Sequence, residues 1–197
     1  MYTTPPEDED GADLFILNVL RGNRAWMSRY SRPPVNGSAK AVVLTCMDSR
    51  IPPLEMLGLS PGEVFIIRNA GNAITDDALR SLLICLTVME CRNVMVVGHS
   101  SCGMRSSGHL DERVAEAVNV EALSEFLGEG IVDARSWLGF YEPHERDWAM
   151  GQAATLRELL GRVMPGIVVK VSSALYHLED GRLEMLDQPS QKMAIST

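Results

Sequence analysis

Two short, continuously apolar segments limit the folds open to this chain more than any other feature. They are AVVLTC at 41–46 and NVMVVG at 93–98, and both are rich in β-branched residues. Apolarity that is continuous, rather than alternating, predicts strands buried on both faces, as in a parallel sheet. A strong helical pattern at 75–89 lies between them. We therefore expect an α/β fold with a central, mostly parallel sheet flanked by helices.

The remaining elements fit the same plan. We expect a helix over 13–30, bent or split at Gly22, and further helices over 54–59, 111–126 and 147–163. Further strands are expected over 63–70, over 166–176 and, after a hairpin turn at 179–181, over 182–186. A length of 197 residues without internal repeats suits one domain. We predict a flexible arm at 1–12, a single domain at 13–188 and a flexible tail at 189–197.

Composition argues against several classes of protein. The net charge of −8 disfavours non-specific binding to nucleic acid, because phosphates would be repelled. No segment approaches the roughly 20 apolar residues of a membrane helix. The acidic first residues lack the basic start and apolar centre of a secretory signal. Four cysteines are too few for a disulfide scaffold, and Cys85 and Cys91 are expected to be buried and reduced. We expect a cytoplasmic, reducing location.

Both apolar segments end in side chains that can bind a metal. The first ends in Cys46, and the second is followed by His99 and Cys102. The carboxyl ends of neighbouring parallel strands meet at one edge of a sheet, so we expect the three side chains to converge. Two thiolates and an imidazole are typical zinc ligands, and three protein ligands leave one coordination position open, as in catalytic sites. A redox pair of the two cysteines is a poorer explanation, because it leaves the histidine without a role.

Asp48 is the ambiguous fourth group. It could bind the zinc in a closed state, or Arg50 could hold it in a bidentate pair and leave the open position to water. In the second arrangement the carboxylate could orient a zinc-bound hydroxide. Two thiolates place more negative charge on the metal than three imidazoles would, so we expect the rate to rise toward alkaline pH.

The strings CMDSR at 46–50 and HSSCG at 99–103 resemble the two signatures of the β-class carbonic anhydrases. RNAGN at 68–72 and TDDALRSL at 75–82 support the resemblance, which extends from about residue 14 to residue 186. It implies a zinc lyase that reversibly hydrates carbon dioxide to bicarbonate and a proton by zinc-bound hydroxide, and a homodimer or larger homo-oligomer. It further implies zinc ligands at Cys46, His99 and Cys102, with Asp48 and Arg50 as the catalytic pair.

Two other functions stay open. Relatives in this family hydrolyse carbon disulfide or carbonyl sulfide with the same zinc set, and the signature residues cannot separate these small substrates. The string KVSSALYHL at 170–178 also departs from the commoner members. A non-catalytic, zinc-stabilised module is less favoured, because a structural site has no use for the pair of Asp48 and Arg50.

Several other residues carry weaker expectations. Gly71 and Gly103 are candidate substrate-binding positions that permit close backbone approach, although simple turn glycines explain them equally well. Arg68 either pairs with a carboxylate across a subunit boundary or lies on the surface. Three histidines outside the site have no ligand partner at a useful spacing: His109, His144 and His177. Of these, His109 is the first to test as a proton shuttle. Three aromatic residues are expected in the core or in an interface: Trp137, Phe140 and Trp148.

Overall fold

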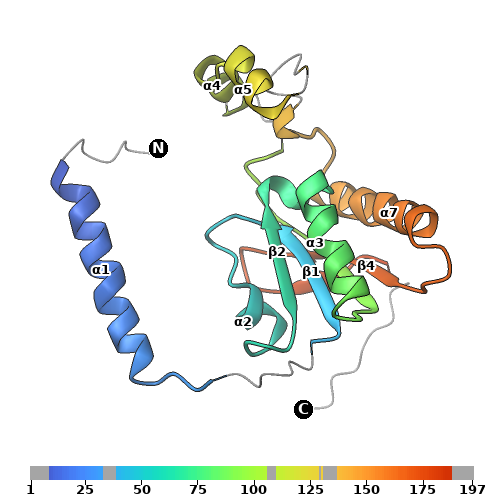
Figure 1. Ribbon diagram of the computed structural model, residues 1–197, viewed down its shortest axis with the longest axis horizontal. Helices are drawn as coiled ribbons and strands as arrows, with labels where there is room; N and C mark the ends of the chain where they lie inside the picture. The colour runs from blue at the N-terminus through green and yellow to red at the C-terminus, as the bar shows by residue number, and fades with distance from the viewer. Residues whose placement is uncertain (1–8, 33–38, 106–109, 129, 131–136, 188–197) are drawn as a thin grey trace. The chain divides into compact units, whose positions relative to one another are not determined.

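The computed structural model describes residues 9–32, 39–105, 110–128, 130 and 137–187 (Figure 1). The chain forms two compact units, residues 1–35 and residues 36–197. The described residues of the first unit include helix α1 (Glu9–Met27), and the second unit contains the sheet. The predicted domain at 13–188, with its arm at 1–12 and tail at 189–197, stays a prediction.

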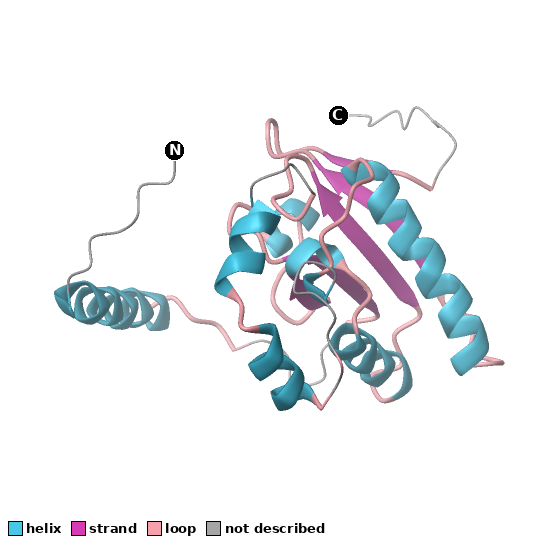
Figure 2. Cartoon of the chain, turned by 90° about the horizontal axis from the view of Figure 1, so that it is seen from above, coloured by secondary structure: helices cyan, strands magenta, loops and turns pink. Residues whose placement is uncertain are grey.

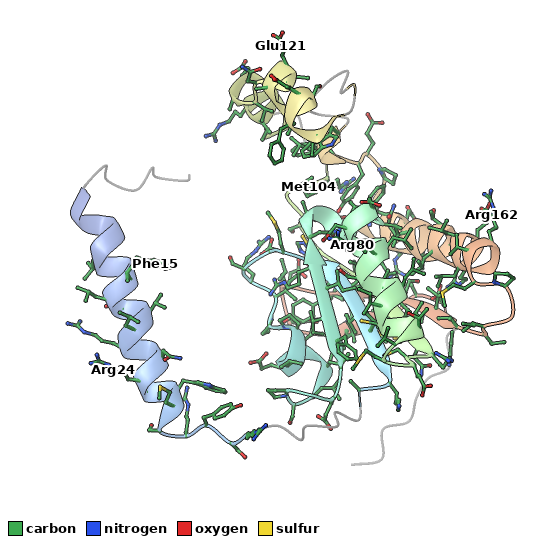
Figure 3. The ribbon with its side chains drawn as sticks, viewed as in Figure 1. Phe15, Arg24, Arg80, Met104, Glu121 and Arg162 are labelled. Carbon is green, nitrogen blue, oxygen red and sulfur yellow. The ribbon has the colours of Figure 1, made fainter. Side chains whose placement is uncertain are left out.

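Helix α1 is continuous from Glu9 to Met27, where the sequence suggested a bent or split helix over 13–30. Its apolar side chains are solvent-exposed in this unit, among them Phe15, which Figure 3 labels together with Arg24. No helix in the described part of the chain is long and apolar enough to cross a bilayer.

The second unit is built on a five-stranded sheet with the order β2-β1-β3-β4-β5. Its strands are β1 (Ala41–Cys46), β2 (Phe65–Asn69), β3 (Asn93–His99), β4 (Lys170–Tyr176) and β5 (Leu183–Met185). The first four are mutually parallel, and β5 pairs antiparallel with β4. The two continuously apolar segments are β1 and β3, side by side at the centre. The predicted α/β fold with a mostly parallel sheet is therefore confirmed.

Two helices cover one face of this sheet, as Figures 1 and 2 show: α3 (Asp76–Thr87) and α7 (Glu145–Val163). Their apolar side chains, including Leu82 and Leu156, pack on Val42, Val94 and Val171 of the strands. The Thr75 side chain accepts a hydrogen bond from the backbone N–H of Ala78 and caps α3, as the sequence predicted.

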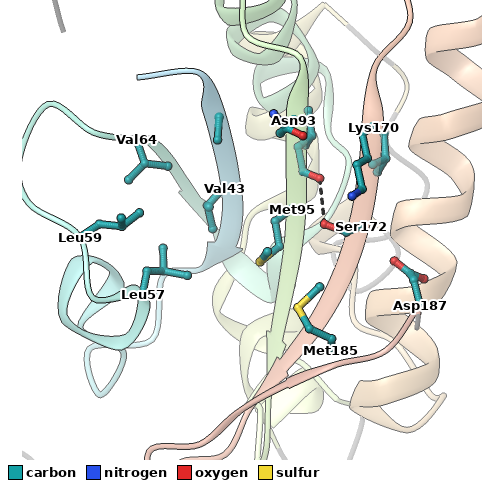
Figure 4. A pocket seen from close by; sticks show the side chains of 13 residues that line it. Val43, Leu57, Leu59, Val64, Asn93, Met95, Lys170, Ser172, Met185 and Asp187 are labelled. Atoms are coloured by element: carbon teal, nitrogen blue, oxygen red, sulfur yellow. Dashed lines mark hydrogen bonds between the residues drawn. The ribbon is translucent and has the colours of Figure 1, made fainter. Parts of the chain in front are cut away.

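The opposite face carries the short helix α2 (Pro53–Leu57) and a second core around Val43, Val97 and Tyr141. A pocket of about 360 Å³ opens on this face, with Val43, Leu57, Met95 and Met185 among its lining residues (Figure 4). Its wall includes the first residue of β1, β3 and β4. The pocket thus lies at the opposite end of the strands from Cys46 and His99.

Two further predicted segments differ in detail from the structure, for identifiable reasons. The helical patterns expected over 111–126 form two helices, α4 (Leu110–Ala117) and α5 (Val120–Leu127), because the Asn119 side chain accepts a hydrogen bond from the N–H of Ala122 and starts a new helix. The strand expected from residue 166 begins at Lys170, because Gly166 has a positive φ of 94° and the N–H of Ile167 closes a turn onto Met164.

Candidate metal centre

The carboxyl ends of β1 and β3 bring three potential metal ligands together. Cys46 is the last residue of β1, His99 is the last residue of β3, and Cys102 lies in the turn that follows. Their ligand atoms all lie within 4.8 Å of one another, and all three residues are buried. Thr45 of β1 is paired with Val97 of β3, so the register of adjacent strands places the thiol beside the imidazole.

The imidazole of His99 is oriented as a metal ligand requires. Its Nδ1 lies 3.0 Å from the carbonyl oxygen of Ser100, so a proton on Nδ1 is donated there and the lone pair is on Nε2. This Nε2 is buried and has no hydrogen-bond partner among the described residues. A buried polar atom without a partner costs about 1–3 kcal/mol, which a bound metal would offset.

The two thiols differ in their surroundings. A hydrogen bond from Cys102 lowers the pKa of Cys46, and contacts with His99 and the backbone N–H groups of Asp48 and Gly71 lower it further. The same hydrogen bond to Cys46, together with burial, raises the pKa of Cys102. A thiolate is thus favoured at Cys46. Two sulfurs and an available imidazole nitrogen match the ligand set of zinc, so the residues present fit this metal.

Asp48 lies beside this cluster, held by Arg50. The guanidinium donates from Nε to Oδ1 at 2.9 Å and from its terminal nitrogen to Oδ2 at 2.6 Å, and the backbone N–H of Arg50 also donates to Oδ1. This pairing lowers the pKa of Asp48 to about 2. Oδ2 lies 4.0 Å from Nε2 of His99. The carboxylate therefore stays ionised and faces the metal centre, and its binding to zinc in a closed state stays a prediction.

Two arginines tie the ligand loops together. Arg50 also donates to the carbonyl of Ser101 at 3.1 Å, which joins the loop after β1 to the loop after β3. Arg68, at the end of β2, donates to the carbonyls of Cys46 and Asp48 at 3.0 and 2.6 Å. The sequence suggested a carboxylate partner or a surface position for Arg68, and the residue is indeed exposed. Its backbone partners are reachable because Arg68 lies on the strand adjacent to β1.

A buried tyrosine that the sequence did not single out completes the environment of the sulfurs. Tyr141 is 4% exposed and packs in the same core cluster as Cys46 and Cys102. Burial raises the pKa of Tyr141, so its hydroxyl stays protonated. No residue spacing pointed to this contact, because Tyr141 reaches the site from a loop 39 positions after Cys102 in the chain.

The two glycines predicted near the site have different surroundings. Gly71 has a positive φ of 70°, and its N–H donates to the sulfur of Cys46 at 3.4 Å. Gly103 lines a pocket of about 270 Å³ in front of the centre, whose other walls are mainly apolar: Met47, Ala70, Met104, Val114 and Phe140, with Cys46, Asp48 and Cys102. Phe140, expected in the core or an interface, therefore faces this pocket. Substrate binding by either glycine stays a prediction.

The other histidines have structural partners where they are described. His144 accepts a hydrogen bond from the N–H of Arg146 at the start of α7, and His177 pairs with Glu184 at 2.9 Å. His109 lies outside the described residues. Cys85 and Cys91 are buried free thiols, as predicted.

Comparison with known proteins places the chain in a family. A family model described as carbonic anhydrase matches residues 41–146. The chain belongs to the carbonic anhydrase family. The named relatives put it in the β-class: it is 37% identical over 88 residues to "Beta-carbonic anhydrase 1" of Mycobacterium tuberculosis, a match that covers 44% of this chain and 54% of that protein. The chain thus spans about half the length of this curated relative.

The chain is also similar to a solved structure and to a hydrolase. A crystal structure of carbonic anhydrase from Streptococcus mutans matches with a TM-score of 0.64 at 25% identity, covering 95% of this chain and all of that one. A carbon disulfide hydrolase from Acidianus is 44% identical over 62 residues, covering 32% of this chain and 30% of that protein. The β-carbonic anhydrase fold is thus shared over nearly the whole chain.

Proposed function

We propose that this β-carbonic anhydrase family member catalyses the reversible hydration of carbon dioxide to bicarbonate and a proton at the centre formed by Cys46, His99 and Cys102. The observation that carries the proposal is Nε2 of His99, which is buried and has no hydrogen-bond partner in the described part of the chain. It lies 4.0 Å from a carboxylate that Arg50 fixes in place. A site that only stabilised the fold would not need an ionised acceptor beside the metal position.

Zinc at these ligands would act as a Lewis acid that makes water nucleophilic near neutral pH. In the reaction, the oxygen of water bonds to the carbon of carbon dioxide and one proton is released. Asp48 has both oxygens engaged by Arg50 but keeps free lone pairs, so it can accept a hydrogen bond from the attacking water and orient it. The apolar pocket in front of the centre suits an uncharged linear substrate.

Stopped-flow hydration of carbon dioxide by the zinc-loaded protein, followed with a pH indicator, tests this proposal. We expect turnover well above the uncatalysed rate and its loss in Cys102→Ser protein that no longer retains zinc. A zinc-loaded protein without hydration activity would refute the proposal.

Hydrolysis of carbon disulfide or carbonyl sulfide is the second candidate. The apolar pocket wall of Met47, Met104, Val114 and Phe140 favours it, because carbon disulfide is less polar than carbon dioxide and bicarbonate. Similarity to the Acidianus carbon disulfide hydrolase supports it as well. Sulfide release measured beside carbon dioxide hydration separates the two activities, and the absence of both in zinc-loaded protein would favour a non-catalytic module.

We also propose that the protein works in the cytoplasm as a homodimer or larger homo-oligomer. Four free cysteines, two of them at the metal centre, support a reducing compartment. Exposed Ile84, Val88 and Met89 at the end of α3 support a subunit contact, because apolar clusters of this kind often mark interfaces. Light scattering coupled to size exclusion should give a mass of at least twice 21.7 kDa; a monomer would refute the assembly.

A further inference from the structure

The turn after β3 orients the imidazole of His99 through the carbonyl group of the next residue. Nδ1 of His99 lies 3.0 Å from the carbonyl oxygen of Ser100. That carbonyl belongs to the peptide unit between Ser100 and Ser101, and Ser101 has a positive φ of 53°. A residue other than glycine keeps this conformation only where its surroundings hold it. The placement of Ser100 therefore decides whether the imidazole presents Nε2 to the metal centre.

Ser100 is held by the hairpin that joins β4 to β5. Its backbone N–H donates to the carbonyl of Tyr176, the last residue of β4, at 3.0 Å. Its hydroxyl accepts a hydrogen bond from the backbone N–H of Leu178 at 2.9 Å and donates one to the carboxylate of Glu179, also at 2.9 Å. These hydrogen bonds join the residue that follows His99 to a hairpin 78 and 79 positions further along the chain.

The hairpin is itself closed by backbone hydrogen bonds. The N–H of Gly181 donates to the carbonyl of His177 at 2.8 Å, and the N–H of His177 donates to the carbonyl of Arg182 at 2.9 Å. Because the turn is closed in this way, the carboxylate of Glu179 has a defined place beside the hydroxyl of Ser100.

The use that Ser100 makes of its hydroxyl is unusual for a turn residue. Serine in a turn commonly hydrogen-bonds to backbone groups of its own segment. The hydroxyl of Ser100 instead engages the hairpin both as a donor and as an acceptor. The second N–H of a metal-binding histidine is generally held by an acceptor of this kind, and changing such a partner typically weakens metal binding 10–100-fold.

We propose that Ser100 and Glu179 are positioning residues that fix the imidazole of His99 for metal binding. The proposal rests on metal binding at the proposed catalytic centre. Neither side chain is among the residues that line the pocket in front of the centre, so both act through His99 rather than on the substrate. The hairpin, which lies outside the segment 41–146 that the family model matches, thereby gains a role in the site.

Two measurements on Ser100→Ala protein test the proposal. Chelator competition gives the dissociation constant for zinc, and heteronuclear NMR with isotope-labelled histidine gives the rate at which the Nδ1 proton of the zinc-bound histidine exchanges with solvent. We expect both quantities to rise about tenfold, because the carbonyl that holds this proton loses its support. Ser100→Thr keeps the hydroxyl and should return both to the wild-type values.

Glu179→Ala tests the same contact from an exposed position, away from the core. It should raise both quantities about threefold, as expected for the loss of one hydrogen bond. Asp180→Ala is the matched control. Asp180 is the next exposed carboxylate in the hairpin, and it accepts a hydrogen bond from the backbone N–H of Arg182 at 3.0 Å. Its removal should leave both quantities unchanged.

Wild-type values of both quantities in Ser100→Ala protein would overturn the proposal, and if that variant does not fold, wild-type values in Glu179→Ala protein would do so. An effect in Ser100→Ala alone would remove Glu179 from it. Equal effects of Asp180→Ala and Glu179→Ala would also contradict it, because they would trace the change to the hairpin as a whole.

The same experiments separate this inference from the proposed activity. If the wild-type protein binds no zinc, the metal centre and this inference both fail. If the expected changes occur in a protein that hydrates no carbon dioxide, only the proposed activity fails.

Discussion

At the scale of single residues, the pair of Asp48 and Arg50 carries the most specific chemical claim. Asp48→Asn keeps the shape of the side chain but removes its negative charge and one acceptor oxygen. We expect carbon dioxide hydration to fall by about a hundredfold, in the range found when one positioned acid–base group is lost, while one zinc per chain is retained. Stopped-flow rates and metal analysis on the same sample measure the two quantities.

Asp77→Asn is the control, since Asp77 forms an exposed pair with Arg80 at 2.6 Å on α3, outside the metal centre. It should leave the hydration rate unchanged. Full activity in Asp48→Asn protein would remove Asp48 from the mechanism.

The sequence predicted the convergence of Cys46, His99 and Cys102 because each follows a buried strand of one parallel unit, and parallel strands align their ends. It could not predict that Tyr141 packs beside these cysteines, because the loop that carries it has no periodic pattern. Arg68 is a similar case: its partners are backbone carbonyls, which leave no trace in the pattern of side chains.

At the scale of elements, the close approach of α7 to β3 holds the centre together. A Cβ atom at Gly98 would lie 3.1 Å from Cβ of Ala149 and 3.3 Å from the carbonyl oxygen of Glu145. Gly98→Val should therefore push α7 away from the strand and lower the free energy of unfolding by about 1–3 kcal/mol, as overpacking does elsewhere. Urea denaturation followed by circular dichroism measures this.

Gly151→Ala is the matched substitution on α7 itself. Gly151 lies in mid-helix with no atom within 4 Å of a Cβ at that position, so alanine should raise the free energy of unfolding by up to about 1 kcal/mol. Equal effects of the two changes would contradict the close packing at Gly98.

The elements that were predicted well are those whose signal is local. Continuous segments of apolar, β-branched residues predicted strands β1 and β3, and the N-capping residue Thr75 predicted the start of α3. The break between α4 and α5 depends on one side-chain cap at Asn119, and the late start of β4 depends on a turn at Gly166; a helical or apolar pattern averaged over many residues does not detect such single-residue features.

At the scale of the whole molecule, an ionic cluster closes the far edge of the sheet. Glu184 of β5 accepts hydrogen bonds from Arg146 of α7 at 2.5 Å and from His177, which follows β4, at 2.9 Å, and Arg182 lies 3.5 Å away. One carboxylate thus joins a helix, a strand end and the hairpin.

The hydrogen bonds from Arg146 and then His177 lower the pKa of Glu184 from 4.5 to about 2. Because the pKa is lower in the folded state, the carboxylate stabilises the fold above about pH 4.5, and this stabilisation is lost as the pH falls from there toward 2. The side chain is 29% exposed, so solvent screening reduces the contribution to about 1 kcal/mol.

Glu184→Gln should therefore lower the free energy of unfolding by about that amount at pH 7, and the difference from the wild type should shrink as the pH falls below 4.5. Urea titrations of both proteins at pH 7, 5 and 3 measure this difference in the free energy of unfolding. Glu142→Gln is the control, since Glu142 is exposed. A difference that stayed constant over this pH range would show that Glu184 acts by shape rather than by charge.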